Sequence, residues 1–61
     1  MDNGPAIIAI VKQIVDTTVI TLVYRGQILK GRLISIVPVV GDSVIAEYLP
    51  LSREYYVVAI I

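Results

Sequence analysis

Short runs of β-branched and aromatic residues, each ending at a turn signal, dominate this sequence. TTVITLVY at residues 17–24 runs into Arg25-Gly26, and SVIAEYL and EYYVVAII follow further along the chain. Residues of these types favour strands, and Gly, Pro and Asp between them mark turns. The spacing predicts about five short strands, which is the number found in a small closed barrel.

The clearest unit is a hairpin whose arms are residues 17–24 and 27–37, with Arg25-Gly26 as its turn. Alternation divides the second arm between two faces, with Leu29, Gly31 and Leu33 on one and Ile28, Lys30, Arg32 and Ile34 on the other. A glycine in mid-strand usually marks a bulge or bend where another backbone passes close. We therefore expect the strand to bend at Gly31.

The second half of the chain is divided by Pro38, by a tight turn at Gly41-Asp42 and by Pro50. Pro38 restricts strand pairing to an edge or a bulge. The segment PLSR is too short for a helix of any length and predicts a single turn before a last strand that begins at Glu54.

The N-terminal segment allows two interpretations. Asn3 can cap a helix, Pro5 suits its first turn, and apolar residues recur at helical spacing, which predicts a short amphipathic helix over residues 5–15. Those apolar residues are Ile7, Ile10, Val11 and Ile14. Their β-branched side chains disfavour a helix, so a strand at residues 6–11 is the alternative.

We also predict which side chains form the core. The expected core residues are Val19, Val23, Leu29, Leu33, Ile36 and Ile45, and the expected outward residues are Ile20 and Leu22.

The chain carries more apolar residues than its size can bury. Its 61 residues are 57% hydrophobic, against roughly 45–50% in ordinary domains, and so short a chain buries only about 60% of its unfolded surface. It has no Cys and no His, and therefore no disulfide and no Cys or His metal site. We expect a homo-oligomer, without a cofactor, whose outward apolar residues contact a neighbouring subunit.

From residue 5 to residue 36 the chain resembles the Sm-like superfamily, which includes Sm, Lsm and bacterial Hfq proteins. A short N-terminal helix and an alternating strand lead to a turn glycine, Gly26; a second glycine, Gly31, follows, and Leu33 lies two residues beyond it. The resemblance implies one domain over residues 1–61, mainly β, a small five-stranded SH3-like barrel with a short N-terminal helix. It also implies a cyclic ring of about five to seven subunits that pair strands edge to edge.

The residues with which this family reads bases have no counterpart here. Residues 37–41 are Val-Pro-Val-Val-Gly, which can neither stack on a base nor hydrogen-bond its edge. The resemblance implies binding of RNA, or another nucleic acid, and the missing base-reading residues imply that its sequence specificity is low. Arg25, Lys30 and Arg32 are the candidates for phosphate contacts and Tyr24 for stacking.

Two alternatives accompany that prediction. The three cations can instead form a solvated strand face that keeps an edge from aggregating. The chain can also be an oligomerisation or scaffold module that kept the barrel and lost nucleic-acid binding.

Catalysis has no support in the sequence. Asp42, Glu47 and Glu54 lie in three different segments without a neighbouring base or nucleophile, and the serines have no His to activate them. We expect neither an enzyme nor a small-molecule substrate.

The most apolar segment, residues 6–23, is interrupted by Lys12 and Asp16 and is too polar for a membrane span. No basic residue precedes it, unlike in a secretory signal. We expect a cytoplasmic protein that does not contact the membrane.

Overall fold

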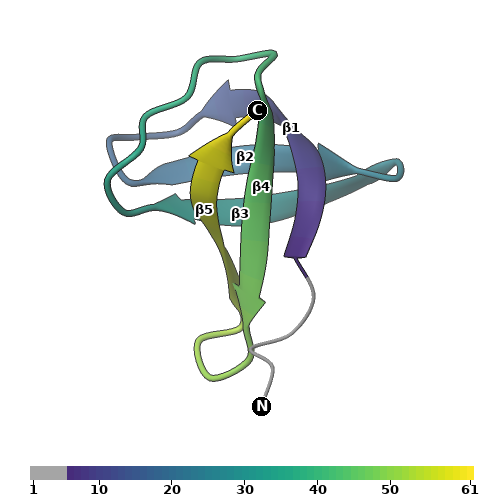
Figure 1. Cartoon of the computed structure of the whole chain (residues 1–61), viewed down its shortest axis with the longest axis vertical. Helices are drawn as coiled ribbons and strands as arrows, with labels where there is room; N and C mark the ends of the chain where they lie inside the picture. The colour runs from purple at the N-terminus through teal and green to yellow at the C-terminus, as the bar shows by residue number, and fades with distance from the viewer. Residues whose placement is uncertain (1–5) are drawn as a thin grey trace.

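A computed structural model describes residues 6–61, which form five β-strands closed into a barrel (Figure 1). The strands are β1 (Ala6–Ile14), β2 (Val19–Tyr24), β3 (Gln27–Leu33), β4 (Ser43–Leu49) and β5 (Glu54–Ile60). The prediction of a small five-stranded barrel is confirmed. Among these residues no helix is long and apolar enough to cross a membrane.

The strand order around the barrel is β1-β2-β3-β5-β4. The first three strands are antiparallel neighbours, and β4 returns through the long connection at residues 34–42 to pair with β1. This order is a Greek key. β5 then closes the barrel, antiparallel to β4 and parallel to β3. A five-stranded Greek-key barrel is the architecture of OB-folds; the sequence predicted the number of strands but gave no order for them.

The predicted helix over residues 5–15 is wrong, because residues 6–14 form β1, and the alternative strand at residues 6–11 is confirmed. Ile7 and Val11 are buried while Ile10 and Ile14 are exposed, so the four residues that fit one helical face lie on two faces of a strand. Pairing with β2 and with β4 supplies main-chain hydrogen bonds on both sides of β1. Asn3 and Pro5, which suggested a helix start, lie outside the described residues.

The hairpin of β2 and β3 has the predicted turn. Arg25 and Gly26 both have positive φ angles, 50° and 78°, as in a type I′ turn. This two-residue turn places Tyr24 opposite Gln27. Every later pair follows from this register.

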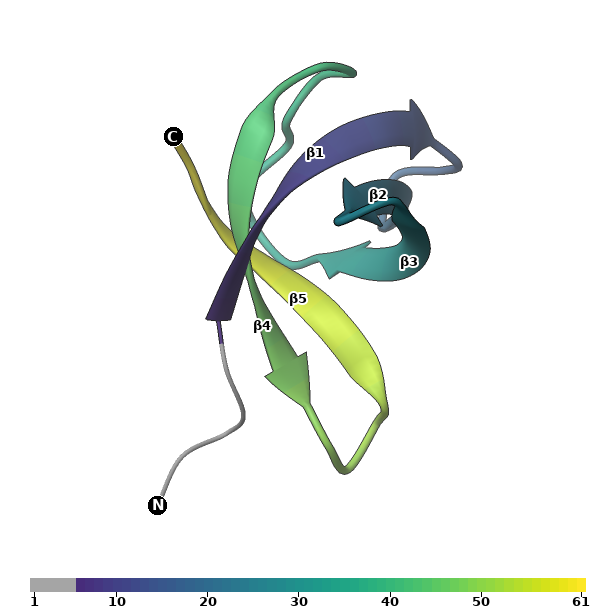
Figure 2. The same cartoon turned by 90° about the vertical axis from the view of Figure 1, so that its right-hand side faces the viewer.

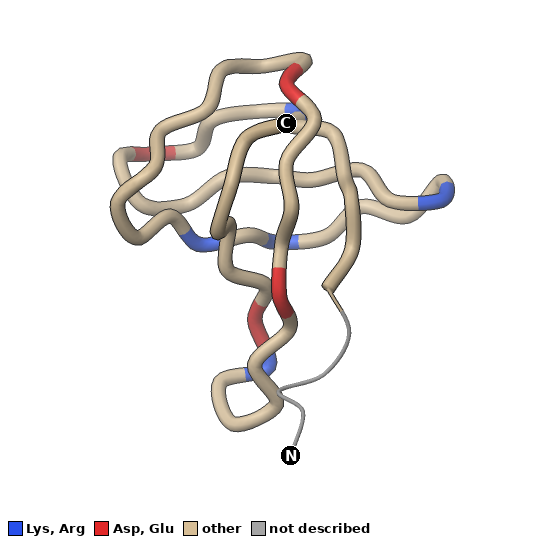
Figure 3. Tube along the Cα trace, viewed as in Figure 1, with Lys and Arg blue, Asp and Glu red and all other residues tan. Residues whose placement is uncertain are grey.

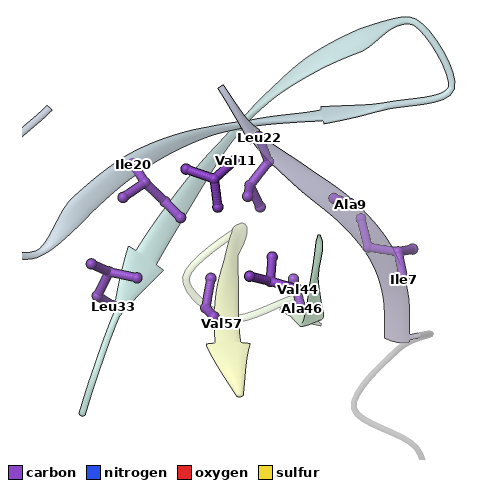
Figure 4. Close-up of a cluster of buried hydrophobic side chains, with 9 residues drawn as sticks. All are labelled: Ile7, Ala9, Val11, Ile20, Leu22, Leu33, Val44, Ala46 and Val57. Carbon is purple, nitrogen blue, oxygen red and sulfur yellow. The ribbon is translucent and has the colours of Figure 1, made fainter. Parts of the chain in front are cut away.

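That register overturns most of the predicted core. It pairs Ile20 with Gly31 and Leu22 with Leu29, so these residues share the inward face. Ile20 and Leu22, expected outside, are fully buried. The buried cluster consists of Ile7, Ala9, Val11, Ile20, Leu22, Leu33, Val44, Ala46 and Val57 (Figure 4). Of the predicted core residues, Leu33 belongs to the cluster, Leu29 packs against it, and Val19, Val23, Ile36 and Ile45 lie outside it, only half-buried.

Gly31 is buried beneath the side chains of β2. A Cβ atom at this position would lie 3.0 Å from Leu22 Cδ1 and 3.2 Å from Ile20 Cγ1. The sequence predicted that another backbone passes close to Gly31. The close neighbours are instead the side chains of Ile20 and Leu22. A side chain here would fit only if Ile20 and Leu22 moved by a few tenths of an ångström, so glycine is the residue that this narrow barrel favours.

The two later turns are also as predicted. Before β4, Gly41 has a φ of 95°, and the Asp42 carboxylate accepts a hydrogen bond from the Val39 amide at 2.9 Å. Residues 50–53 form a single turn between β4 and β5, in which Arg53 has a φ of 56°. Pro38 lies in the connection between β3 and β4, where it is fully buried.

We predict that Leu22→Ala lowers the free energy of unfolding by about 2–5 kcal/mol, because it leaves a cavity in the core. Val23→Ala, on the half-buried outer face, should cost about 1 kcal/mol or less. Urea denaturation at one fixed protein concentration measures both. A larger loss at Val23 than at Leu22 would contradict the observed orientation of β2.

Candidate functional site

The four residues predicted to contact nucleic acid all lie on the β2–β3 hairpin. Tyr24 ends β2, Arg25 lies in the turn, and Lys30 and Arg32 lie on β3. Positive charges occur at the hairpin tip and along β3 (Figure 3). Because Lys30 and Arg32 are two residues apart on one strand, they share its outer face.

At the hairpin tip, Arg25 lies over the ring of Tyr24, with Cζ 5.3 Å from the ring centroid. This distance is typical of a cation–π contact. Arg25 is exposed and occupies a left-handed backbone conformation, which is uncommon for residues other than Gly, Asn and Asp. The turn thus presents Arg25 to solvent, above a Tyr24 ring that is half-buried and packs against the core.

Arg32 is not a free cation. Its Nε donates to Oε1 of Glu54 at 3.1 Å, and its Nη2 donates to Oε2 at 2.9 Å. Such a two-bond pair satisfies both oxygens of the carboxylate. The hydrogen bonds from Arg32 hold the pKa of Glu54 below its ordinary value, and the same bonds raise the pKa of Arg32.

This ion pair was not predicted, because Glu54 was interpreted as an isolated surface carboxylate. The pair depends on the parallel contact between β3 and β5, which places Arg32 opposite Tyr56. Sequence alternation assigns faces within a strand but does not say which distant strand lies beside it. No local signal in the sequence could have found the pair.

An open groove of about 560 Å³ follows the outer face of the hairpin. Lys30 and Ile28 line it from β3, Val19 and Thr21 from β2, and Asp16 from the turn between β1 and β2. The groove therefore combines aliphatic side chains with one cation and one carboxylate. This mixture is less favourable for a polyanion than three free cations would be.

Asp16 also organises the turn in which it lies. Its Oδ1 accepts hydrogen bonds from the amides of Thr18 and Val19 at 2.8 and 3.0 Å. These bonds, that from the Thr18 amide above all, lower the pKa of the Asp16 carboxyl. The carboxylate is therefore ionised at neutral pH, and its negative charge stays in the groove.

A second candidate surface is the aliphatic face, which we define as the outward residues Ile8 and Ile10 of β1, Ile45 of β4 and Ala59 of β5. The strand registers place Ile8 beside Ile45, and Ile45 beside Ala59. Ile8 is 61% exposed and Ile10 is 50% exposed. Contiguous aliphatic surface of this kind on a soluble domain usually marks a site of interaction.

The connection between β3 and β4 is also aliphatic. Ile34, Val37, Val39 and Val40 are each more than half exposed. Pro38 in the same segment is buried, and main-chain hydrogen bonds join Gly41 and Asp42 to Val11, so the connection is held to the barrel while the four aliphatic side chains are exposed.

Two further tyrosines, Tyr48 and Tyr55, lie beside each other across β4 and β5, with ring centroids 5.1 Å apart and planes tilted by 55°. Tyr55 packs against the core. This geometry is a packing contact between aromatic rings, so neither ring adds to the hairpin surface.

Comparisons with protein-family models, with curated proteins and with solved structures gave no match to this chain. Its own residues and geometry therefore carry the proposals that follow.

The lowered pKa values give a prediction for stability. A carboxylate whose pKa falls on folding stabilises the folded state fully above its unfolded pKa, and this contribution is lost as the pH falls through the folded value. The ordinary value for Glu54 is 4.5. We therefore expect the melting temperature to decrease as the pH is lowered from about 5 to about 3.

Glu54→Gln should weaken this pH dependence, because it removes the charge that Arg32 holds. Glu47→Gln is the matched control, since Glu47 has no ion pair among residues 6–61. Thermal melts at a series of pH values test both variants. Equal pH profiles for wild type and Glu54→Gln would show that the ion pair does not stabilise the fold.

Proposed function

We propose that this chain is an oligomerisation module, a small barrel that associates with copies of itself through its aliphatic face. The observation that carries the proposal is the exposure of Ile8 and Ile10 next to Ile45 on the outside of a closed barrel. Burying aliphatic side chains yields roughly 25 cal/mol per Å². A chain of 61 residues with no disulfide gains needed stability from such a contact.

The aliphatic face suits a second copy better than a charged partner. Its members are all aliphatic, and the chain as a whole has a net charge of zero, so there is little electrostatic repulsion between copies. A closed cyclic arrangement covers the face in every subunit and leaves no open end. The Sm-like resemblance gives about five to seven subunits for such a ring, and both the ring and its size are part of this proposal.

The test is the mass of the protein in solution. We expect the wild type to sediment as an oligomer at micromolar concentration, with a melting temperature that rises with protein concentration. Ile8→Glu should weaken association at least tenfold, because it places a charge in the apolar contact. Gln13→Glu is the matched control, since it adds the same charge to an exposed position of β1 outside the aliphatic face.

Two results would contradict the proposal. One is a stable wild-type mass of 6.7 kDa at micromolar concentration. The other is equal weakening by Ile8→Glu and Gln13→Glu, which would place the contact elsewhere.

A second candidate function is binding of single-stranded nucleic acid, RNA by first expectation, at the β2–β3 hairpin. The observation that favours it is Arg25, which keeps a left-handed conformation where Asn or Gly would be easier and which lies over Tyr24. Unfavourable backbone conformations persist at functional sites more often than elsewhere. By fold analogy alone, the face of β2 and β3 is the surface with which OB-folds bind oligonucleotides.

The structure reduces the number of cations available for this function. Arg25 and Lys30 are exposed, while Arg32 is paired with Glu54 and Asp16 lines the same groove. Binding would therefore be weak for one subunit and would depend on repetition of the site in an oligomer. Low sequence specificity is expected, because phosphate contacts carry no base information.

Arg25→Asn separates this function from the fold. Asn tolerates the left-handed conformation, so the variant should be as stable as the wild type or about 1 kcal/mol more stable. It should bind a labelled single-stranded RNA of about 12 nucleotides several-fold more weakly, and the log–log salt slope should fall by about 0.7. Fluorescence anisotropy at several salt concentrations measures both quantities.

Arg53→Asn is the matched control. Arg53 is also an exposed arginine with positive φ, but it lies in the β4–β5 turn. It should gain similar stability without losing affinity. Equal losses in the two variants, or no salt-dependent binding by the wild type, would leave the hairpin without this function.

A further inference from the structure

Only part of β3 has a strand on both sides. Its contact with β5 covers Gly31, Arg32 and Leu33, whereas β2 pairs with β3 from Gln27 onward. Away from this contact the strands separate: β3 continues to the hairpin tip on the right of Figure 1, while the start of β5 lies below it. Among residues 6–61, no strand pairs with residues 27–30 on the side opposite β2.

The register shows which main-chain groups lie on that open side. In an antiparallel pair, residues that exchange hydrogen bonds with their partner alternate with residues whose groups point away. The Leu33 amide donates to the Thr18 carbonyl oxygen at 2.8 Å, so Leu33 and Thr18 form a hydrogen-bonded pair. Because hydrogen-bonded residues recur at every second position along the strand, Gly31 and Leu29 are also hydrogen-bonded to β2. Ile28 and Lys30 therefore direct their N–H and C=O groups away from β2. The parallel pairing of Gly31 with Tyr55 takes up the Lys30 carbonyl, so the open side keeps the N–H and C=O groups of Ile28 and the N–H group of Lys30.

The side chains of this open edge are accessible as well. Ile28 is 56% exposed and Lys30 is exposed, so neither covers its own main chain. Ile28 also lies beside Val23, which lies beside Ile10, in one outward aliphatic row. The edge thus offers three main-chain groups, an aliphatic row and a cation.

The exposed charges on the edge itself are positive, and the carboxylate of Asp16 lines the groove beside Ile28 and Lys30. Arg25 and Lys30 are exposed at its two ends, and the carboxylate of Glu54 is held by Arg32. A second copy that paired through the same edge would bring like charges together, which disfavours it. A strand with carboxylate side chains would meet complementary charge instead.

We infer that residues 27–30 form a strand-addition site for an extended segment of a partner protein that carries acidic side chains. The main chain of the segment pairs with Ile28 and Lys30, an aliphatic side chain contacts Ile28, and a carboxylate contacts Lys30. Main-chain bonds supply the affinity in this mode of recognition, and the alternate side chains supply the selectivity. The main-chain groups of the site lie on the edge of β3, away from the aliphatic face, although the aliphatic row beside them ends at Ile10 of that face. The site does not depend on oligomerisation.

The test is an NMR titration of the wild-type chain of 61 residues with a blocked synthetic peptide of about seven alternating Glu and Val residues. In the free protein, the amides of Leu29 and Gly31 should exchange with solvent more slowly than those of Ile28 and Lys30. Added peptide should shift the Ile28 and Lys30 amide signals and slow their exchange at least tenfold. A peptide of alternating Lys and Val is the charge control and should leave them unchanged.

Ile28→Pro blocks the edge without removing a bond to β2, because the Ile28 amide points away from β2. We expect it to abolish peptide binding, while Ile28→Thr, which keeps the amide and a β-branched side chain, retains it. Both variants keep Arg25 and Lys30, so RNA binding at the hairpin should persist in both. If Ile28→Pro does not fold, the peptide titration of the wild-type protein still tests the inference.

Several results would overturn the inference. Peptide-induced shifts that avoid residues 27–30, equal binding of the Lys-containing peptide, or unchanged binding by a folded Ile28→Pro would each do so. If Ile28→Pro instead lowers the mass of the free protein, the edge is occupied by a second copy, and the acidic-partner inference is wrong. Apart from that change in mass, these results do not bear on the Ile8→Glu test of the aliphatic face.

Discussion

The barrel is closed by a short parallel contact, and much of its outer chemistry follows from that closure. Three residue pairs join Gly31, Arg32 and Leu33 to β5. The contact places Arg32 close to Glu54, so a residue that the sequence offers as a phosphate ligand becomes half of an ion pair. Because β3 extends beyond the contact, the same closure leaves residues 27–30 with an open edge (Figure 2). The pairing of Arg32 with Glu54 and the exposure of the β3 edge therefore have the same cause, the short contact between β3 and β5.

How much of this fold the sequence could predict depends on the range of the interaction. The turn at Arg25-Gly26, the strands after β1 and the later turns follow from local preferences, and all were predictable. The orientation of β2 was predictable too: a two-residue turn pairs Leu22 with Leu29, so an inward Leu29 requires an inward Leu22. The predicted core is wrong because alternation gives the two faces of each strand but does not say which face of β2 lies on the same side as which face of β3. Joining them through the turn would have corrected it.

β1 and the candidate site could not be resolved in the same way. Ile7 and Val11 satisfy both a helical and an alternating pattern, and only pairing with β2 and β4 selects the strand. The site depends on contacts between distant segments. Tyr24 and Arg25 are neighbours in the chain, so their contact was open to prediction, whereas that of Arg32 with Glu54 spans 22 residues. Sequence placed the charges on the correct face without showing which were free.

The narrow interior of the barrel accounts for its aliphatic surface. Several inward positions hold small residues, Ala9, Ala46 and Gly31, and at Gly31 even a Cβ atom would crowd Ile20 and Leu22. An interior packed to this density cannot accept more large side chains without strain. The additional isoleucines of this 57% hydrophobic chain must therefore lie outside, as Ile8 and Ile10 do. Since the barrel cannot enlarge its own core, more apolar surface can be buried only against another molecule, and this is the physical basis on which we propose association with a second copy.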